Sequence, residues 1–350
     1  MRETENDMKP LLAKAATGEA LTEAEAEVAF DIIMSGDATH AQIGGFLMAL
    51  RVRGETVAEI TGAVRSMRAK ALAIEAPPGA FCMAGTGGDA KGTFNISTGT
   101  SLVVAGCGVP MAKHGNRAQS SKCGSADVFA ALGVNIDADM ALVKRSIWEA
   151  GIGFLMAPRH HGAMRHVVGT RVELGTRTIF NFLGPLSNPA GVKRQLAGVF
   201  TRQWIEPMAQ VLGNLGSERA WVVHGSDGID ELTTTGSSHV AELKDGKVST
   251  FEVTPEDAGL PRAAPEDLKG GDPETNAGIL HGVLDGAPGP IRNIVILNTA
   301  GALIAAGKAE NLAEGAALAA VAIDDGKAKA ALEKMVAITN SKPPRQEDAP

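Results

Sequence analysis

The chain has 350 residues, of which 44% are hydrophobic and 21% charged, so it can bury a sizeable core and form a large and a small domain. Its formal net charge of −7 argues against a general nucleic-acid-binding protein. The first residues are polar and acidic, unlike a signal peptide, and the longest apolar stretch, 294–306, is too short to span a bilayer. Cys82, Cys107 and Cys123 lack the spacing of a metal site or a disulfide framework. We therefore expect a cytoplasmic protein with reduced thiols and with neither nucleic-acid nor membrane partners.

The first seventy residues predict helices. Threonines that precede apolar periodic runs are followed three residues later by Glu or Gln, in the pairs Thr22–Glu25, Thr39–Gln42 and Thr56–Glu59. In such a capping box the hydroxyl accepts a bond from a free amide, and the later side chain bonds back. Together with the segment 8–16 these signals predict about four helices, which form a helical domain over residues 1–76.

The pattern changes after residue 76. Short apolar runs of strand length alternate with helical stretches, at 81–84, 109–112, 134–136, 152–156, 195–200 and 220–223. This alternation predicts an α/β domain over residues 77–350, with a central, mostly parallel mixed sheet flanked by helices. Residues of about 165–190 can contribute to the helical domain instead. The Asp245-Gly246 turn predicts a hairpin at the periphery of the sheet.

A long basic segment lies inside this acidic protein. Residues 90–126 contain no Asp or Glu but include Lys91, Lys113, Arg117 and Lys122, which suggests a local anion site unless the clustering is chance.

The glycine-rich string Gly85-Thr-Gly-Gly-Asp89 directly precedes this segment. Glycines after a strand let backbone amides approach phosphate oxygens closely. The string also matches the dinucleotide fingerprint, but that fingerprint needs an acid about 20 residues further on, and none occurs before Asp127. We therefore favour a phosphate loop over a dinucleotide site.

Two further phosphate-type elements follow. Asn95-Ile-Ser-Thr98 stands where a helix should begin, so Ser97 or Thr98 is either an ordinary N-cap or part of an anion site at the helix N-terminus. Lys113-His-Gly-Asn-Arg117 follows an apolar run and offers cations, an amide and a glycine bend. Three such elements within forty residues are more specific than any one alone.

The adjacent carboxylates of Asp230 and Glu231 repel each other unless a cation lies between them. Mg²⁺ suits one or two carboxylates completed by water and substrate phosphates. An exposed acidic turn without a metal is the alternative. Composition alone likewise leaves Arg171 and Arg177 open, as bidentate carboxylate partners or as structural ion-pair residues. His160, His161 and His166 have no cysteine beside them and are a weak candidate for a transition-metal site.

At these residues the chain closely resembles the anthranilate phosphoribosyltransferase family. The matching motifs occur in order and span nearly the whole chain: Gly85–Asp89, Asn95–Thr98, Lys113–Arg117, Gly124–Asp127, Arg177–Asn181, Gly184–Leu186 and Asp230–Glu231. The resemblance implies transfer of the phosphoribosyl group of 5-phosphoribosyl-1-diphosphate (PRPP) to anthranilate in tryptophan biosynthesis, with two Mg²⁺ ions and a homodimer formed through the helical domain.

The resemblance also implies the substrate contacts. The PRPP-binding residues would be Gly85, Gly88, Asp89, Thr93, Asn95, Ile96, Ser97, Thr98, Lys113, His114, Gly115, Asn116, Arg117, Ala118, Gln119, Ser120, Ser121 and Ser125. Gly85, Asn116 and Arg171 would contact anthranilate, Ser97 would contact one Mg²⁺, and Asp230 and Glu231 would hold the second. No residue is expected to act as a general acid or base.

One departure and two rivals qualify this interpretation. Gly162 stands where the family often has proline, and the glycine leaves the backbone of that loop freer than a proline would. A pyrimidine nucleoside phosphorylase of the same architecture would carry different loop motifs and need no diphosphate-bound Mg²⁺. A non-catalytic, nucleic-acid-binding relative would carry a basic surface and an eroded Asp230–Glu231 pair, neither of which is seen.

Overall fold

The computed structural model describes residues 7–118 and 122–343. Its N-terminal part is a bundle of α1 (Met8–Ala16), α2 (Glu23–Ser35), α3 (His40–Arg53) and α4 (Val57–Ala69). The capping boxes at Thr22, Thr39 and Thr56 are confirmed, since each hydroxyl accepts a bond from the backbone three residues later and each N3 side chain bonds back. Gly36, in the left-handed conformation, ends α2.

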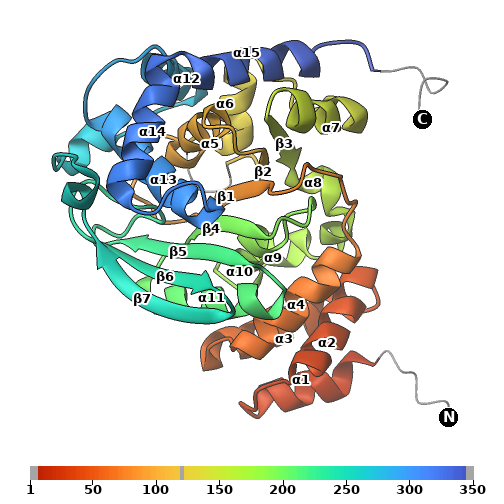
Figure 1. Ribbon diagram of the computed structural model, residues 1–350. Coiled ribbons are helices and arrows are strands. Elements are labelled where there is room, and N and C mark those ends of the chain that lie inside the picture. The colour runs from red at the N-terminus through yellow and green to blue at the C-terminus, as the bar shows by residue number, and fades with distance from the viewer. Residues whose placement is uncertain (1–6, 119–121, 344–350) are drawn as a thin grey trace.

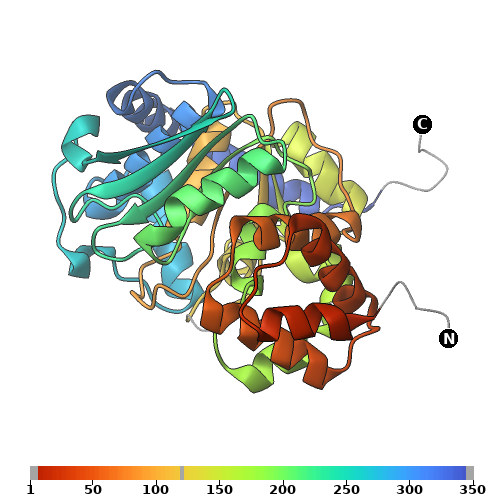
Figure 2. The same cartoon turned by 90° about the horizontal axis from the view of Figure 1, so that it is seen from below.

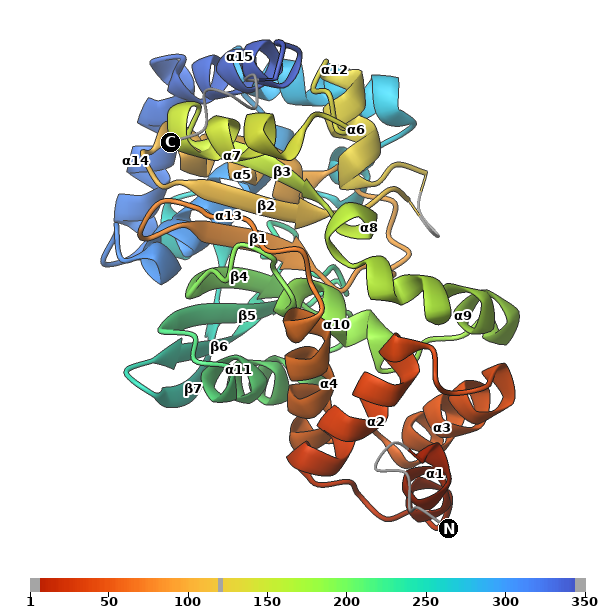
Figure 3. The same cartoon turned by 90° about the vertical axis from the view of Figure 1, so that its right-hand side faces the viewer.

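One seven-stranded sheet forms the centre of the larger domain (Figure 3). Its strands are β1 (Phe81–Gly85), β2 (Met111–Gly115), β3 (Ile152–Met156), β4 (Arg194–Gly198), β5 (Arg219–Gly225), β6 (Ser238–Lys244) and β7 (Lys247–Val253). The order is β3-β2-β1-β4-β5-β6-β7, with β1 to β5 parallel and β6 and β7 antiparallel. The predicted mostly parallel mixed sheet is therefore confirmed.

Two sequence expectations about the sheet have different outcomes. The hairpin is confirmed, because Asp245 and Gly246 connect β6 to β7 with positive φ angles of 51° and 71°. The strand expected at 134–136 is wrong. Val134 and Ile136 are buried, but they lie in the irregular link after α6 (Ser125–Ala131), where no neighbouring strand pairs with them.

Helices cover both faces of the sheet (Figure 1). One face packs against α5 (Ile96–Gly106), α6 and the C-terminal helices α12 (Pro273–Leu284), α13 (Pro290–Ala306), α14 (Leu312–Asp324) and α15 (Lys327–Thr339). The opposite face packs against α7 (Met140–Glu149) beside β3, and against α11 (Ile205–Asn214) beside β5 and β6. Strand alternation produces this division, since Trp221 faces the first set and Val222 the second. Among the described residues no helix is both long and apolar enough to cross a membrane.

The segment between β3 and β4 leaves the sheet and joins the helical bundle. It contains α8 (Ala157–His160), the 3₁₀ turn η1 (Gly162–His166), α9 (Val168–Leu174) and α10 (Phe180–Leu186). The Phe180 ring packs edge-on against Phe30 of α2, with ring centroids 5.5 Å apart. Seen from below, this segment lies beside the bundle (Figure 2). It thereby carries Arg171 and Arg177 to the cleft between the two parts of the chain.

Candidate active site

A cleft of about 1080 Å³ opens at the carboxyl end of β1. In parallel α/β sheets ligands bind at this end of the strands. Four segments line the cleft: the loop after β1, residues 122–123 before α6, the α9–α10 region and residues 269–276. The lining residues are Gly88, Asp89, Ala90, Gly92, Thr93, Lys122, Cys123, Val168, Arg171, Val172, Gly175, Thr176, Arg177, Asn181, Lys269, Gly270, Gly271 and Asn276.

The glycine loop is shaped by backbone conformations that few other residues adopt. Gly87 and Gly88 have φ angles of 66° and 73°. The amide of Gly87 donates a hydrogen bond to Oδ2 of Asp230 over 2.7 Å. A Cβ at Gly85 would collide with the same carboxylate. These contacts fold the loop tightly around Asp230.

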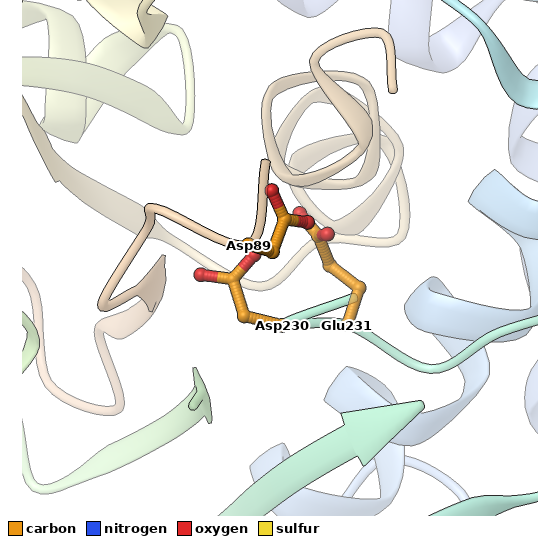
Figure 4. Close-up of side chains that lie close together, drawn as sticks. All are labelled: Asp89, Asp230 and Glu231. Carbon is orange, nitrogen blue, oxygen red and sulfur yellow. The ribbon is translucent and has the colours of Figure 1, made fainter. Parts of the chain in front are cut away.

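Three carboxylates meet where the loop approaches the segment after β5 (Figure 4). One oxygen from each of Asp89, Asp230 and Glu231 lies within 4.8 Å of the others. Burial raises the pKa of Asp230 to about 6, and the charge of Asp89 adds to this shift. Burial also raises the pKa of Glu231, with a further contribution from the charge of Asp230. The ionised forms of Asp230 and Glu231 are therefore unfavourable unless a nearby positive charge compensates them.

This donor set fits a hard divalent cation. Mg²⁺ binds carboxylate oxygens and completes its coordination with water and phosphate oxygens, and a bound cation would relieve the repulsion among these groups. Asp89 joins the predicted pair Asp230 and Glu231, although the sequence had indicated it only as a PRPP contact. Within residues 7–118 and 122–343 no histidine or cysteine belongs to such a cluster.

The first turn of α5 lies beside these carboxylates. Asn95, rather than Ser97 or Thr98, is the N-cap residue, and its side chain makes no capping bond. Its amide instead donates to the Cys123 carbonyl over 3.2 Å, while its Oδ1 accepts a bond from Asn276 over 2.9 Å. The backbone of Ser97 bonds to Glu231, which partly opposes the raised pKa of that carboxyl. Ile96 and Thr98 are buried in the helix, and Thr93 lines the cleft.

The predicted basic loop begins with two buried side chains. Lys113 is 2% exposed, and its amine donates to the Met83 carbonyl over 2.7 Å. Burial lowers its pKa, whereas the nearby charges of Cys82, Glu231 and Asp230 oppose that effect. His114 faces the Gly184 carbonyl, 3.2 Å from its Nδ1, and packs against the ring of His161. Neither residue lines the cleft wall.

The rest of this loop folds onto the start of α6. Oδ1 of Asn116 accepts a bond from the Arg117 amide over 2.8 Å. Arg117 pairs with Asp127 at 3.2 Å, and the Ala118 amide donates to the same carboxylate. Gly115 lies against Ser125, the first residue of α6, with no room for a Cβ between them. Gln119, Ser120 and Ser121 lie outside the described residues.

The two candidate arginines have different surroundings. The Arg171 guanidinium lies over the Phe180 ring, 5.6 Å from its centroid, and makes no ion pair or side-chain hydrogen bond with any described residue. Burial lowers its pKa. Arg177 stacks on the ring of Phe200 and donates to the Gly88 carbonyl. Within the described part of the cleft, Arg171 is therefore the free guanidinium, and Arg177 is engaged with the glycine loop.

The wall of the cleft formed by residues 269–271 and Asn276 is not predicted from the sequence. Residues 269–271 and Asn276 reach the site because Gly270 bonds to Gly92 and Asn276 bonds to Asn95. The Lys269-Gly-Gly271 string could have been read as a phosphate-type loop, but Asn276 gave no sequence signal.

Comparisons with known proteins show which families the chain resembles in sequence. The sequence model of the glycosyl transferase family, a/b domain, matches residues 80–329, and that of the glycosyl transferase family, helical bundle domain, matches residues 9–71. Anthranilate phosphoribosyltransferase of Paramagnetospirillum magneticum is 65% identical over 333 residues, which cover 95% of this chain and 96% of the relative.

Solved structures give the same result. The crystal structure of anthranilate phosphoribosyltransferase from Thermus thermophilus aligns with a TM-score of 0.90 at 44% identity, covering 94% of this chain and 99% of that chain. The enzyme from Saccharomyces cerevisiae in complex with PRPP and Mg aligns with a TM-score of 0.86 at 27% identity, covering 95% and 97% of the two chains.

Proposed function

The chain belongs to the anthranilate phosphoribosyltransferase family, and on this premise we propose how its residues divide the work of the reaction. The enzyme transfers the phosphoribosyl group of PRPP to the amine of anthranilate, giving N-(5-phosphoribosyl)anthranilate and diphosphate in tryptophan biosynthesis. It uses Mg²⁺. The observation that carries the assignment of the site is the convergence of Asp89, Asp230 and Glu231 beside the glycine loop.

PRPP binds along the glycine loop, the start of α5 and the loop after β2. The positive end of the α5 helix dipole and the backbone of the glycine loop attract phosphate oxygens. Lys122 and Lys269, which line the cleft, add positive charge at its rim. This proposal retains all the PRPP residues that the family resemblance implies, including Gln119, Ser120 and Ser121, which lie outside the described residues.

Two Mg²⁺ ions accompany PRPP, one at Ser97 and one at the carboxylates of Asp230 and Glu231, with Asp89 as an added ligand of the second. The bound ions supply positive charge to the departing diphosphate. The raised pKa values of Asp230 and Glu231, together with the proximity of the Asp89 carboxylate, support a cation at this point. A single ion shared by all three carboxylates is the outcome that would overturn the two-ion assignment.

Anthranilate binds against Arg171, Asn116 and Gly85. Arg171 holds the carboxylate and so orients the neighbouring amine toward the ribose C1. The aromatic amine is already neutral near pH 7, so no strong general base is needed. The protein contributes positioning and electrostatic stabilisation of a cation-like sugar, rather than covalent catalysis.

The proposed units are residues 1–76, with a contribution from about 165–190, and residues 77–350. The protein is proposed to be a cytoplasmic homodimer that associates through the helical domain. The exposed apolar side chains of Val28 and Val52, on α2 and α3, support such a contact. Light scattering of the purified protein tests it, and the mass of a single chain would overturn it.

The decisive experiment follows anthranilate fluorescence with purified protein. Loss of fluorescence should require both PRPP and Mg²⁺. Phosphorolysis of a pyrimidine nucleoside would favour the phosphorylase alternative. DNA or RNA binding without turnover would favour the nucleic-acid-binding relative.

A further inference from the structure

Arg177 links the segment between the two domains to the loop that bears Asp89. Its Nη2 donates to the carbonyl of Gly88, the residue directly before Asp89. The bond joins positions 89 residues apart in the sequence. The carbonyl of Gly88 and the side chain of Asp89 are separated by a single peptide unit, so fixing the first restricts the second.

The guanidinium is itself held in place. Its central carbon lies 3.8 Å from the centroid of the Phe200 ring, and Phe200 stacks on Phe182 of α10 with centroids 5.5 Å apart. A guanidinium over an aromatic face gains both stacking and cation–π attraction. The planar group therefore has one defined orientation toward the loop.

The same short segment after β4 also holds the other end of the loop. The Phe200 amide donates to Oγ1 of Thr86 over 3.1 Å, and the Thr86 amide donates to the Gly198 carbonyl over 3.0 Å. The loop is thus held at Thr86 by Gly198 and Phe200, and at Gly88 by Arg177. Between these ties, the Gly87 amide reaches Asp230.

We infer that Arg177 is a positioning residue, which fixes the glycine loop so that the carboxylate of Asp89 lies beside those of Asp230 and Glu231. This inference rests on the proposed metal site. It assigns Arg177 a role different from that of Arg171, because Arg177 acts through the loop rather than on anthranilate.

The first test needs no ligand. Hydrogen exchange of the backbone amides of residues 85–91, followed by mass spectrometry, should be at least about tenfold faster in Arg177→Ala than in the wild type, because local opening governs exchange. Arg177→Lys retains the charge but loses the planar stack, so its exchange should lie between the two. Arg202→Ala removes an exposed arginine two residues after Phe200 and is the matched control, with wild-type exchange expected.

The second test separates the substrates. Arg177→Ala should raise the Mg²⁺ concentration for half-maximal rate and the KM for PRPP about tenfold or more, with the KM for anthranilate changed less than threefold and partial recovery in Arg177→Lys. Wild-type loop exchange together with wild-type Mg²⁺ dependence in Arg177→Ala would overturn the inference, as would equal rises in both KM values. If Arg177→Ala does not fold, Arg177→Lys decides by the same criteria. A wild-type enzyme that turned over without Mg²⁺ would instead overturn the proposed metal site, whatever the loop exchange.

Discussion

The carboxylate of Asp230 occupies the space beside Gly85 in which the Cβ of any other residue would have to lie. Gly85 does not have a positive φ angle, so its importance is one of space rather than of backbone conformation. The last residue of β1 and the carboxylate of Asp230, a proposed metal ligand, are thus in direct contact.

We therefore expect Gly85→Ala to displace Asp230 from its neighbours. Overpacking of this kind costs about 1–3 kcal/mol of stability, and a small misplacement of reacting groups can lower the rate by about 100-fold. Urea unfolding and kcat/KM measure the two effects. Gly278→Ala, in α12 with open space around it, is the control and should leave activity unchanged. A fully active Gly85→Ala enzyme would show that Asp230 can shift without consequence.

The raised pKa values of Asp230 and Glu231 predict a pH-dependent stability in the absence of metal. A carboxyl whose folded pKa exceeds its unfolded value favours folding at low pH and loses this contribution as pH rises through the folded pKa, here about 6 for Asp230. The double variant Asp230→Asn, Glu231→Gln should thus be more stable than the wild type at pH 7.5, and the difference should vanish near pH 4.

The same double variant should raise the Mg²⁺ requirement and lower kcat, since it removes the charge that holds the ion. Urea unfolding in chelator at both pH values, with activity across a Mg²⁺ titration, provides the measurements. Asp137→Asn, at an exposed site, is the control. Unchanged Mg²⁺ dependence in the double variant would remove these two residues from the metal site.

Acid should destabilise the protein through two buried histidines. Burial lowers the pKa of His114 to about 3 and that of His161 to about 4, in each case with help from a neighbouring histidine. Both are neutral when folded and protonate near pH 6.5 when unfolded. Their contribution to the free energy of unfolding is therefore complete above about pH 6.5. It is lost as pH falls toward 4, by up to about 1.4 kcal/mol per pH unit for each group.

His161→Leu removes one of these titrating groups and should flatten the loss of stability between pH 6.5 and 4.5. The unfolding free energy measured at several pH values gives the slope. His281→Leu, on the C-terminal half of α12, is the control. An equal slope in wild type and His161→Leu would mean that His161 is not kept neutral by the fold.

The features that the sequence predicts correctly are those determined by residues close together in the chain. A capping box involves residues three apart, so Thr22 and Glu25 indicate the start of a helix without any knowledge of tertiary contacts. The apolar run at 134–136 looked like a strand because burial alone produces the same pattern, and only a pairing partner distinguishes the two. The fold class followed from the alternation of runs, which one wrong strand does not alter.

In the candidate site, too, contacts between residues far apart in the sequence could not be predicted. Asp230 was recognised from its neighbour Glu231, but its contact with the glycine loop spans 143 residues, and no spacing rule reveals such a contact. Lys113 was expected to face phosphate from a loop. The structure places it at the centre of the buried strand β2, between β3 and β1, with its amine on the Met83 carbonyl. Strand position, rather than residue type, determined its surroundings.

Arg171 is the arginine best suited to hold the carboxylate of anthranilate. Arg117 is paired with Asp127, and Arg177 is bonded to the Gly88 carbonyl. The guanidinium of Arg171 lies in the cleft over Phe180, without an ion-pair partner among the described residues. Its carboxylate-binding capacity is thus unused in the absence of substrate.

A charge-assisted hydrogen bond contributes roughly 1.5–3 kcal/mol, so Arg171→Ala should raise the KM for anthranilate by about 10- to 150-fold. The KM for PRPP should change much less, and kcat should fall somewhat because the amine loses its orientation toward C1. Arg165→Ala, at an exposed position in the same segment, is the control and should leave both KM values unchanged. Steady-state kinetics with each substrate varied in turn measures these constants. An anthranilate KM within about twofold of the wild type would mean that Arg171 is structural and that another group binds the carboxylate.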